Sequence, residues 1–201
     1  MEHYYSKTPQ SNSRTEAYEW ELRGQSFRFQ TDAGVFSKGK MDFGSGFLIQ
    51  SILDEVEREP LKILDIGCGY GGIGIVLARF FPNAIVHMTD VNERALALCT
   101  QNIGWNRVKN VICYASDLFE NITEQFDVIV SNPPIRAGKA VVYRLFEDAS
   151  QALTADGSFY CVIQKKQGAE SAQRKLADIF MHCECLDKKA GFRILKVQKT
   201  L

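Results

Sequence analysis

The pattern of apolar and polar positions opens with two short runs in which large apolar residues alternate with polar ones. The first run covers residues 18–22 and the second covers residues 27–29, with Gly24 between them. Alternation with a period of two is typical of a strand with one buried face, and glycine suits the turn between two such strands. The sequence therefore predicts an N-terminal β-hairpin. Residues 47–56 then repeat apolar positions at helical spacing, and Ser45 is placed to cap that helix.

From residue 61 onward, short apolar runs alternate with segments of helical periodicity. The expected strands are residues 61–66, 84–89, 111–115, 126–130, 158–164, 183–186 and 192–197, and the expected helices are residues 73–81, 93–105, 140–153 and 169–180. Such alternation favours a mainly parallel sheet with helices on both faces. Only residues 188–191 separate the last two strands, so we expect an antiparallel C-terminal hairpin, because a parallel return needs a longer crossover. The predicted fold is α/β and Rossmann-like, with a seven-stranded sheet.

Length and composition narrow the class of protein. The 201 residues suit one α/β domain. Residues 1–16 are polar, so we expect a tail there and a single domain over residues 17–201, with the hairpin as its N-terminal extension.

Formal net charge is zero, so any binding of nucleic acid must come from local basic clusters. No stretch approaches the roughly 20 apolar residues that cross a bilayer, and the start lacks the apolar core of a signal peptide. We therefore expect a cytoplasmic protein; the oligomeric state stays open.

The six cysteines raise the question of disulfides or bound metal. Four of them lie inside apolar runs, where cysteine acts as a small hydrophobic residue: Cys68, Cys99, Cys113 and Cys161. His182, Cys183 and Cys185 are close in sequence, yet alternation within a strand explains the two cysteines, and no second ligand pair stands at zinc spacing. We expect reduced thiols and no metal.

A glycine-rich turn follows the first strand of the alternating region. Residues 65–72 read Asp-Ile-Gly-Cys-Gly-Tyr-Gly-Gly, so Gly67, Gly69 and Gly72 satisfy the pattern G-x-G-x-x-G. Glycine lets the backbone approach a ligand that any Cβ would block. Because dinucleotide-binding proteins share this pattern, the turn predicts a nucleotide site without specifying the nucleotide.

Two carboxylates follow at the ends of the next two strands. Asp90 stands about twenty residues beyond the glycines, where a carboxylate can accept hydrogen bonds from ribose hydroxyls. Asp117 follows the third strand, where it can accept from an adenine amino group while Leu118 covers the ring. The structural alternatives are a helix cap at Asp90, with Asn92 as a competing cap, and a turn cap at Asp117.

The strongest chemical signal is Ser-Asn-Pro-Pro-Ile at residues 131–135, directly after the strand at residues 126–130. Ligands of open α/β sheets lie outside the carboxyl ends of the strands, so Asn132 should face the same crevice as Gly67 and Asp90. Pro133 and Pro134 fix φ and lack N–H donors, which should leave a stiff loop with free carbonyls. A prolyl turn that only ends the strand is the alternative.

Such a loop can activate an amino group. The exocyclic amine of a purine is a weak nucleophile, because its lone pair is delocalised into the ring. If the Asn132 side-chain oxygen and the Pro133 carbonyl accept its two N–H bonds, the lone pair can turn toward a sulfonium methyl group. No nucleophilic side chain and no dedicated base are required.

The glycine turn, the two aspartates and Asn132-Pro133-Pro134 together resemble class I methyltransferases that act on amino nitrogens. More narrowly, residues 34–37, 40–45 and 132–139 are similar to the small-subunit ribosomal RNA guanine-N2 methyltransferase C family, over about residues 4–199. The resemblance implies a Rossmann-like class I methyltransferase fold, S-adenosyl-L-methionine as cofactor, and guanine N2 of small-subunit ribosomal RNA as substrate. Ribosomal RNA or the small ribosomal subunit would be the partner. In that family the segment Asp42-x-Gly44-Ser45 packs beside the cofactor.

Motifs and resemblance together give the expected site. The cofactor residues are Asp65, Gly67, Cys68, Gly69, Asp90, Val91, Asp117, Leu118 and Asn132. The catalytic residues are Asn132, Pro133 and Pro134, and the substrate-binding residues are Ile135, Arg136 and Lys139. Further basic residues near the expected mouth are Lys38, Lys40, Arg144, Lys165 and Lys166.

The chain departs from the family in two respects. Ile135 stands where many amino methyltransferases place an aromatic residue that stacks on the base; Phe36 and Phe43 are candidates to replace it, with core packing as their alternative role. Longer family members carry a degenerate N-terminal domain for which 201 residues leave no room.

Two other functions stay open. Protein-glutamine amide N-methyltransferases also use Asn-Pro-Pro, but followed by tyrosine. An NAD-dependent oxidoreductase or a nucleotide sensor would account for the glycines alone.

Overall fold

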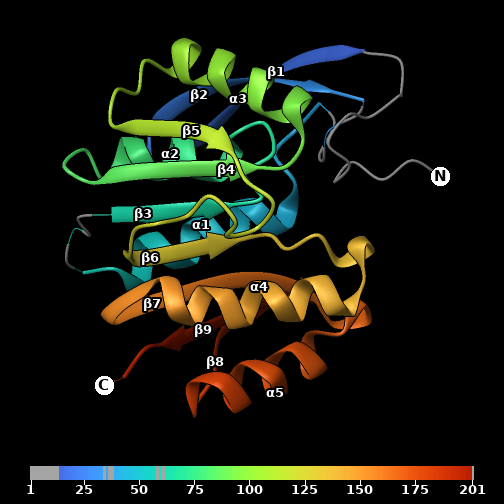
Figure 1. The fold of residues 1–201 in the computed structure, drawn as a ribbon. Coiled ribbons are helices and arrows are strands. Elements are labelled where there is room, and N and C mark those ends of the chain that lie inside the picture. The colour runs from blue at the N-terminus through green and yellow to red at the C-terminus, as the bar shows by residue number, and fades with distance from the viewer. Residues whose placement is uncertain (1–13, 34, 36–38, 58, 60–61, 201) are drawn as a thin grey trace.

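A seven-stranded sheet runs through the centre of the molecule (Figure 1), in the order β5-β4-β3-β6-β7-β9-β8. The computed structural model describes residues 14–33, 35, 39–57, 59 and 62–200. Strand β9 runs in the direction opposite to the other six strands of this sheet. The strands are β3 Lys62–Ile66, β4 Ile85–Asp90, β5 Val111–Ala115, β6 Phe126–Ser131, β7 Leu153–Gln164, β8 Glu184–Lys189 and β9 Phe192–Gln198. The expected seven-stranded, mainly parallel sheet and its antiparallel C-terminal hairpin are confirmed.

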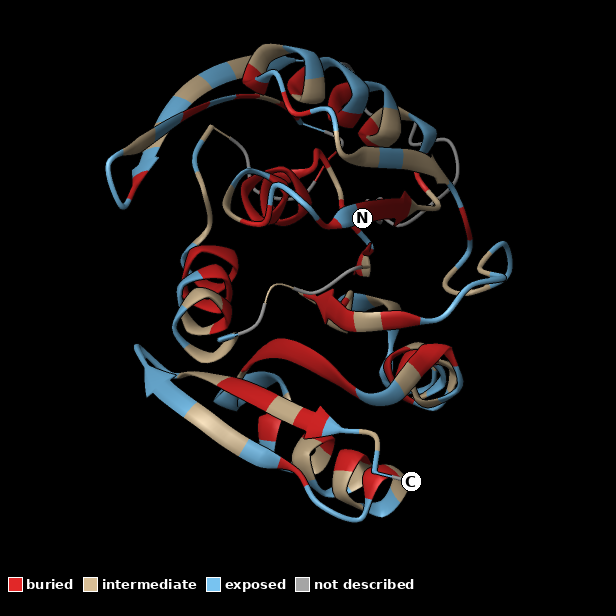
Figure 2. Ribbon diagram, turned by 90° about the vertical axis from the view of Figure 1, so that its left-hand side faces the viewer, coloured by how far each residue is buried: buried red, intermediate tan, exposed pale blue. Residues whose placement is uncertain are grey.

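Helices cover both faces of this sheet, as expected. They are α1 Phe43–Glu55, α2 Gly72–Phe80, α3 Glu93–Asn106, α4 Lys139–Ala152 and α5 Ala169–Phe180, with short 3-10 turns η1 Ile135–Ala137 and η2 Lys165–Gln167. The first three helices pack into one apolar cluster and the last two into the other. Buried residues gather along the central strands and on the helix faces that meet them (Figure 2). A parallel strand covered on both faces has a nearly continuous apolar sequence, which is why the sequence located these strands.

The largest differences from the expected element boundaries lie at the starts of α1 and β7. Helix α1 begins at Phe43, four residues earlier than expected, because Asp42 rather than Ser45 is its cap: an Asp42 side-chain oxygen accepts from the Ser45 N–H at 3.1 Å. Gly44 and Gly46, which are poor helix formers, obscured this start in the sequence. Strand β7 begins at Leu153, whereas the sequence predicted a start at residue 158 and a helix that continued through residue 153. The pairing of β7 with β6 shifts register between Phe126 and Val128.

The expected N-terminal hairpin is confirmed, with β1 Thr15–Leu22 antiparallel to β2 Gln25–Asp32. It is joined to the core by two buried asparagines one helical turn apart on α3. Asn102 accepts from the Gln30 N–H at 2.7 Å and donates to the Gln30 carbonyl at 2.9 Å. Asn106 makes the same two bonds with the Arg28 backbone, at 3.0 and 2.7 Å. These side chains satisfy the free edge of β2 as another strand would.

The predicted tail lies largely outside the described residues, which begin at residue 14; β1 then begins at Thr15. Within the described part of the chain, no helix combines the length and apolarity needed to cross a membrane.

Candidate active site

A cavity of about 270 Å³ opens at the carboxyl ends of β3, β4, β5 and β6. Most residues predicted from the sequence line it: Gly67, Cys68, Gly69, Asp90, Val91, Asp117, Leu118, Asn132, Pro133 and Pro134. The parallel sheet brings them together, because the ends of neighbouring parallel strands meet at one edge. The cavity is also lined by residues that the motifs did not identify, among them Val35, Tyr70, Ser116, Ala137, Val141 and Leu145.

The glycine turn wraps closely around the end of β3. Gly67 and Cys68 both donate their N–H groups to the Thr89 carbonyl at 2.9 Å, which fixes the turn against β4. Gly67 and Gly71 have φ of +72° and +91°, a region that other residues rarely adopt. A Cβ on Gly71 would lie 2.8 Å from the Cys99 sulfur, whereas a Cβ on Gly67 would meet no atom of the described residues within 4 Å. Open space beside Gly67 lets a ligand approach the backbone there.

Asp90 links the glycine turn to the start of α3. One of its carboxylate oxygens accepts from the Gly69 N–H and the other from the Asn92 N–H, both at 2.8 Å. Burial raises the pKa of Asp90. The cap of α3 is Asn92, whose side chain accepts from the N–H groups of Arg94 and Ala95. Asp90 is therefore not the helix cap, and its carboxylate faces the cavity where a ribose can be bound.

Asp65 is not among the residues that line the cavity. Its side chain is fully buried beneath the turn, where one oxygen accepts from the Gly74 N–H at 2.8 Å and the other has no hydrogen-bond partner among the described residues. Burial raises the pKa of Asp65 to about 7. The residue holds the first turn of α2 in place, so its predicted contact with the cofactor would be indirect, through the turn.

The turn after β5 is held by Ser116. Its hydroxyl donates to the Leu118 carbonyl at 2.7 Å and accepts from the Asn121 N–H at 3.1 Å. Leu118 adopts φ of +47°, an uncommon conformation for a branched residue, and it lines the cavity together with the exposed Asp117. The arrangement leaves an apolar side chain and a carboxylate side by side at the position expected for an adenine.

Asn132 lies opposite the glycine turn and is held from α1. Its side-chain amide donates to the Ser45 hydroxyl at 3.0 Å and to an Asp42 oxygen at 3.4 Å. These contacts assign the amide orientation and leave the side-chain oxygen for another donor. The second Asp42 oxygen is buried, and no described residue forms a hydrogen bond with it. The Ser131 hydroxyl donates to the Ile66 carbonyl at 3.0 Å and so ties the base of this loop to β3.

The expectation that both proline carbonyls are free is wrong. The Pro133 carbonyl accepts from the Ile135 N–H, and the Pro134 carbonyl accepts from the Ala137 N–H, both at 2.8 Å. The loop turns directly into η1, so the N–H groups after the prolines bend back onto them. A carbonyl oxygen has two lone pairs, so Pro133 retains one for a further donor.

The three predicted substrate-binding residues are not among those that line the cavity. Ile135 packs against the apolar cluster of α4 and α5, which explains why an aliphatic residue fits after the two prolines. Arg136 and Lys139 are exposed, and the Lys139 ammonium lies 5.1 Å from the centre of the Tyr143 ring. The wall beside Asn132 is instead formed by Ala137, Val141 and Leu145. These residues are spaced four apart in the sequence, which places them on one face of a helix, and this spacing could have identified them as a wall of the site.

A shallower hollow of about 340 Å³ adjoins the active-site cavity and shares Asp42 with it. It is lined by Trp20, Lys40, Met41, Asp42, Phe43, Gly46, Phe47, Gln50 and Lys189. Phe43 is 45% exposed, so it is not a core residue, and its ring centre lies 5.4 Å from that of Phe192. The other stacking candidate, Phe36, and the basic candidate Lys38 lie outside the described residues.

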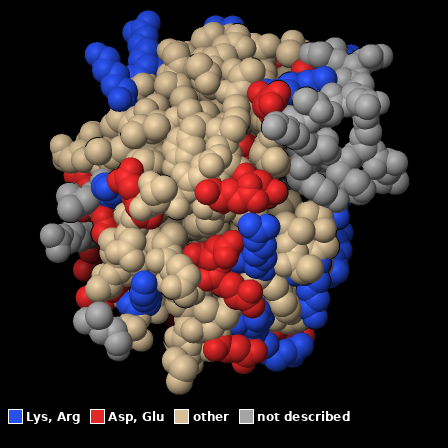
Figure 3. Space-filling view, in the orientation of Figure 1, with Lys and Arg blue, Asp and Glu red and all other residues tan. Residues whose placement is uncertain are grey.

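Charges on the surface are mixed. Figure 3 shows basic and acidic side chains interspersed over the face that carries α4 and α5. Arg144, expected near the mouth, forms ion pairs with Glu120 at 3.8 Å and Asp148 at 3.5 Å. Lys165 and Lys166 are exposed on η2. Among the residues that the structure describes, no single basic patch dominates this face.

Comparison with known proteins identifies the family to which the chain is similar. The family model of the methyltransferase small domain matches residues 26–196. The uncharacterized protein YbxB of Bacillus subtilis is 48% identical over 201 residues, covering 99% of both chains. The ribosomal RNA small subunit methyltransferase C of Haemophilus influenzae is 38% identical over 111 residues, 55% of this chain and 32% of that protein.

A solved structure is also similar over nearly the whole chain. It is the T. thermophilus 16S rRNA N2 G1207 methyltransferase (RsmC) in complex with AdoMet and guanosine, with a TM-score of 0.83 and 27% identity over 94% of this chain and 51% of that chain. The present chain therefore spans about a third to a half of the length of these two methyltransferases.

Proposed function

Because the chain belongs to the methyltransferase small domain family, we propose that it methylates an exocyclic amino group of a base in RNA, namely guanine N2 of small-subunit ribosomal RNA. The chain is an S-adenosylmethionine-dependent methyltransferase with the Rossmann-like fold of that class. The observation that carries the proposal is the orientation of Asn132, whose amide is held by Ser45 and Asp42 so that its oxygen is left for a substrate donor.

The cavity suits the cofactor. Open space beside Gly67 and the left-handed backbone of Gly69 would admit its amino-acid portion, and the Asp90 carboxylate would accept from its ribose. Asp117 and Leu118 would hold the adenine. When bound, S-adenosylmethionine supplies an electrophilic methyl group on a sulfonium.

The residues around Asn132 would orient the substrate amine. The Asn132 oxygen and the remaining lone pair of the Pro133 carbonyl would accept its two N–H bonds, which turns the nitrogen lone pair toward the cofactor. The nitrogen becomes strongly acidic as the new bond forms, so its proton can pass to these acceptors or to water. The apolar wall formed by Ala137, Val141 and Leu145 would exclude water from the reacting groups.

RNA would approach across the hollow next to the active site. Phe43 is exposed there, with Lys40 and Lys189 lining the same hollow. An aromatic ring flanked by ammonium groups can stack on a base and contact the phosphates around it. We assign to Phe43 the stacking role that Ile135 cannot fill, with Arg136 and Lys139 as contacts on the opposite rim.

Single-turnover methyl transfer to ribosomal RNA from cells that lack the protein tests the proposal. Asn132→Ala should fold and bind S-adenosylmethionine, yet transfer methyl groups about 100- to 1000-fold more slowly, comparable with loss of one oxyanion-hole donor. Asn83→Ala is the matched control, because Asn83 is exposed and bonds to Glu59 away from the cavity. A wild-type rate in Asn132→Ala would contradict the mechanism.

Mass spectrometry of the methylated RNA identifies the nucleotide and the nitrogen. Incorporation at N2 of one guanine in the small-subunit RNA supports the proposal. Methylation of glutamine-containing peptides with none of RNA would instead assign the chain to the protein-glutamine class.

A further inference from the structure

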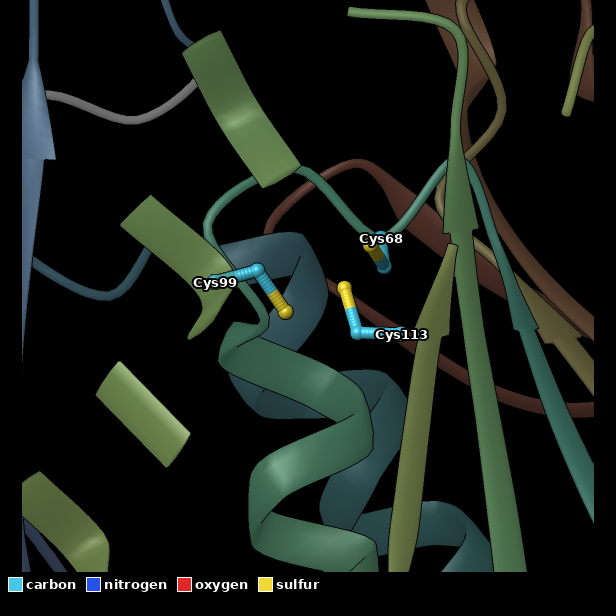
Figure 4. A group of neighbouring side chains, drawn as sticks. All are labelled: Cys68, Cys99 and Cys113. Carbon is cyan, nitrogen blue, oxygen red and sulfur yellow. The ribbon is translucent and has the colours of Figure 1, made fainter. Parts of the chain in front are cut away.

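Three cysteines that are far apart in the sequence meet behind the glycine turn (Figure 4). Cys68 belongs to the turn after β3, Cys99 to α3 and Cys113 to β5. Their sulfur atoms all lie within 4.8 Å of one another, and the three side chains point toward a common centre. Cys68 and Cys99 are buried, and Cys113 is half-buried.

The surroundings of the cluster are rich in acidic groups. Burial, Asp90 and Cys113 all raise the pKa of the Asp65 carboxyl, which lies beside the cluster with one oxygen that no described residue bonds. Hydrogen bonds with the other two thiols, burial and the charge of Asp90 raise the pKa of Cys68. Among the described residues, none of the interactions that shift these pKa values comes from a cationic side chain.

We propose that Cys68, Cys99 and Cys113 bind a thiophilic divalent cation of the zinc class. Zinc–sulfur bonds of about 2.3 Å place the sulfurs of a tetrahedral site about 3.8 Å apart, so the longest separation has to shorten by at most about 1 Å. Three sulfur ligands leave one position of a tetrahedral site, which a water molecule can fill. This proposal differs from the sequence expectation of no metal.

Binding is a proton exchange. Three S–H bonds break and three sulfur–metal bonds form, while three protons pass to the solvent, so the divalent ion and three thiolates carry one net negative charge. Affinity therefore rises with pH. The ion would join the glycine turn, α3 and β5, and because Cys68 stands between Gly67 and Gly69 it would fix the turn that holds the cofactor.

Titration of the reduced full-length chain with Zn²⁺ and with Cd²⁺ tests the site. We expect one ion per chain with a Kd below about 1 µM at pH 7.5, a thiolate-to-cadmium absorbance band in the near ultraviolet, and proton release by calorimetry in two buffers. Cys113→Ser should weaken binding at least about 30-fold, and Cys99→Ser should do the same, since each removes one of three thiolate ligands. Neither the readouts nor the variants depend on methylation of RNA.

The matched control is a variant with both Cys183→Ser and Cys185→Ser, because these two cysteines are the other close pair in the sequence and could bind the ion instead. It should retain the wild-type affinity. The ability of each variant to be stabilised by S-adenosylhomocysteine reports that it is folded. Binding weaker than about 10 µM in the wild-type chain, or loss of binding in the control variant alone, overturns the proposal.

Discussion

The contact between Asn132 and Asp42 predicts that aspartate cannot replace Asn132 by itself. In the wild-type chain the Asn132 amide nitrogen donates to an Asp42 oxygen at 3.4 Å and to the Ser45 hydroxyl at 3.0 Å. Asn132→Asp keeps the acceptor that faces the cavity but replaces this amide by a second carboxylate oxygen. Two acceptors then face each other where a donor and an acceptor had been, and each carries a negative charge.

The size of the effect follows from the distance. Two unit charges 3.4 Å apart repel by about 5 kcal/mol at an effective dielectric constant of about 20. Holding one proton on the pair avoids the repulsion, and protonating an ordinary carboxyl at pH 7 costs about 4 kcal/mol. Solvent in the cavity screens the two charges and so reduces the cost of placing them side by side. We therefore expect the free energy of unfolding to fall by about 2 to 4 kcal/mol at pH 7.

The sign of the pH dependence follows from the shared proton. The folded variant holds a proton that the unfolded chain releases near pH 4, so folding is favoured at low pH and the difference from wild type grows as the pH rises. Below about pH 5 the variant should approach the stability of the wild-type chain. Urea denaturation at several pH values measures this difference, and single-turnover methyl transfer at pH 7 measures the loss of activity, which we expect to be at least about tenfold.

Asp42→Asn in the same chain should relieve this charge repulsion. A neutral carboxamide at position 42 removes the repulsion between two negative charges. Its oxygen can keep the cap on the Ser45 N–H, because asparagine is as good a helix cap as aspartate, so α1 keeps its start. We expect the double variant to recover most of the lost stability and at least about tenfold of the lost activity. Wild-type stability of Asn132→Asp at every pH, or a double variant no better than the single one, would refute this reasoning.

Two further predictions concern the cofactor site. S-adenosylmethionine at about 100 times its Kd should stabilise the chain by about 2.7 kcal/mol and raise its Tm, whereas NAD should not. Asp90→Ala should reduce the shift in Tm. Equal stabilisation by NAD would contradict the cofactor assignment. Burial raises the pKa of Asp65 to about 7. The protonated Asp65 therefore contributes about 4 kcal/mol to the free energy of unfolding below about pH 4, and this contribution is lost as the pH rises through about 7. Asp65→Asn should therefore reduce the fall in the free energy of unfolding between about pH 4 and 8, measured by urea denaturation with a chelator present. If the fall is unchanged, other groups cause it.

The sequence by itself determined the order and type of the main elements, because these depend on local patterns. Strand β3 and helix α5 were located by apolar periodicity, and the turn at residues 67–72 was located by glycines that the backbone needs there. Asn132 and Asp90 could be assigned to one crevice from their positions in the chain alone, since the carboxyl ends of parallel strands share an edge. Boundaries were less well determined where poor helix formers such as Gly44 lie inside a helix.

Only the tertiary structure decided which side chains meet. Asp42 and Asn132 are 90 positions apart, and their contact exists because α1 packs beside the end of β6. The same holds for the three sulfurs of Cys68, Cys99 and Cys113, which come from a turn, a helix and a strand. Periodicity reports which face of an element is buried, but the partner that each side chain finds depends on how the elements pack, and no local pattern encodes that.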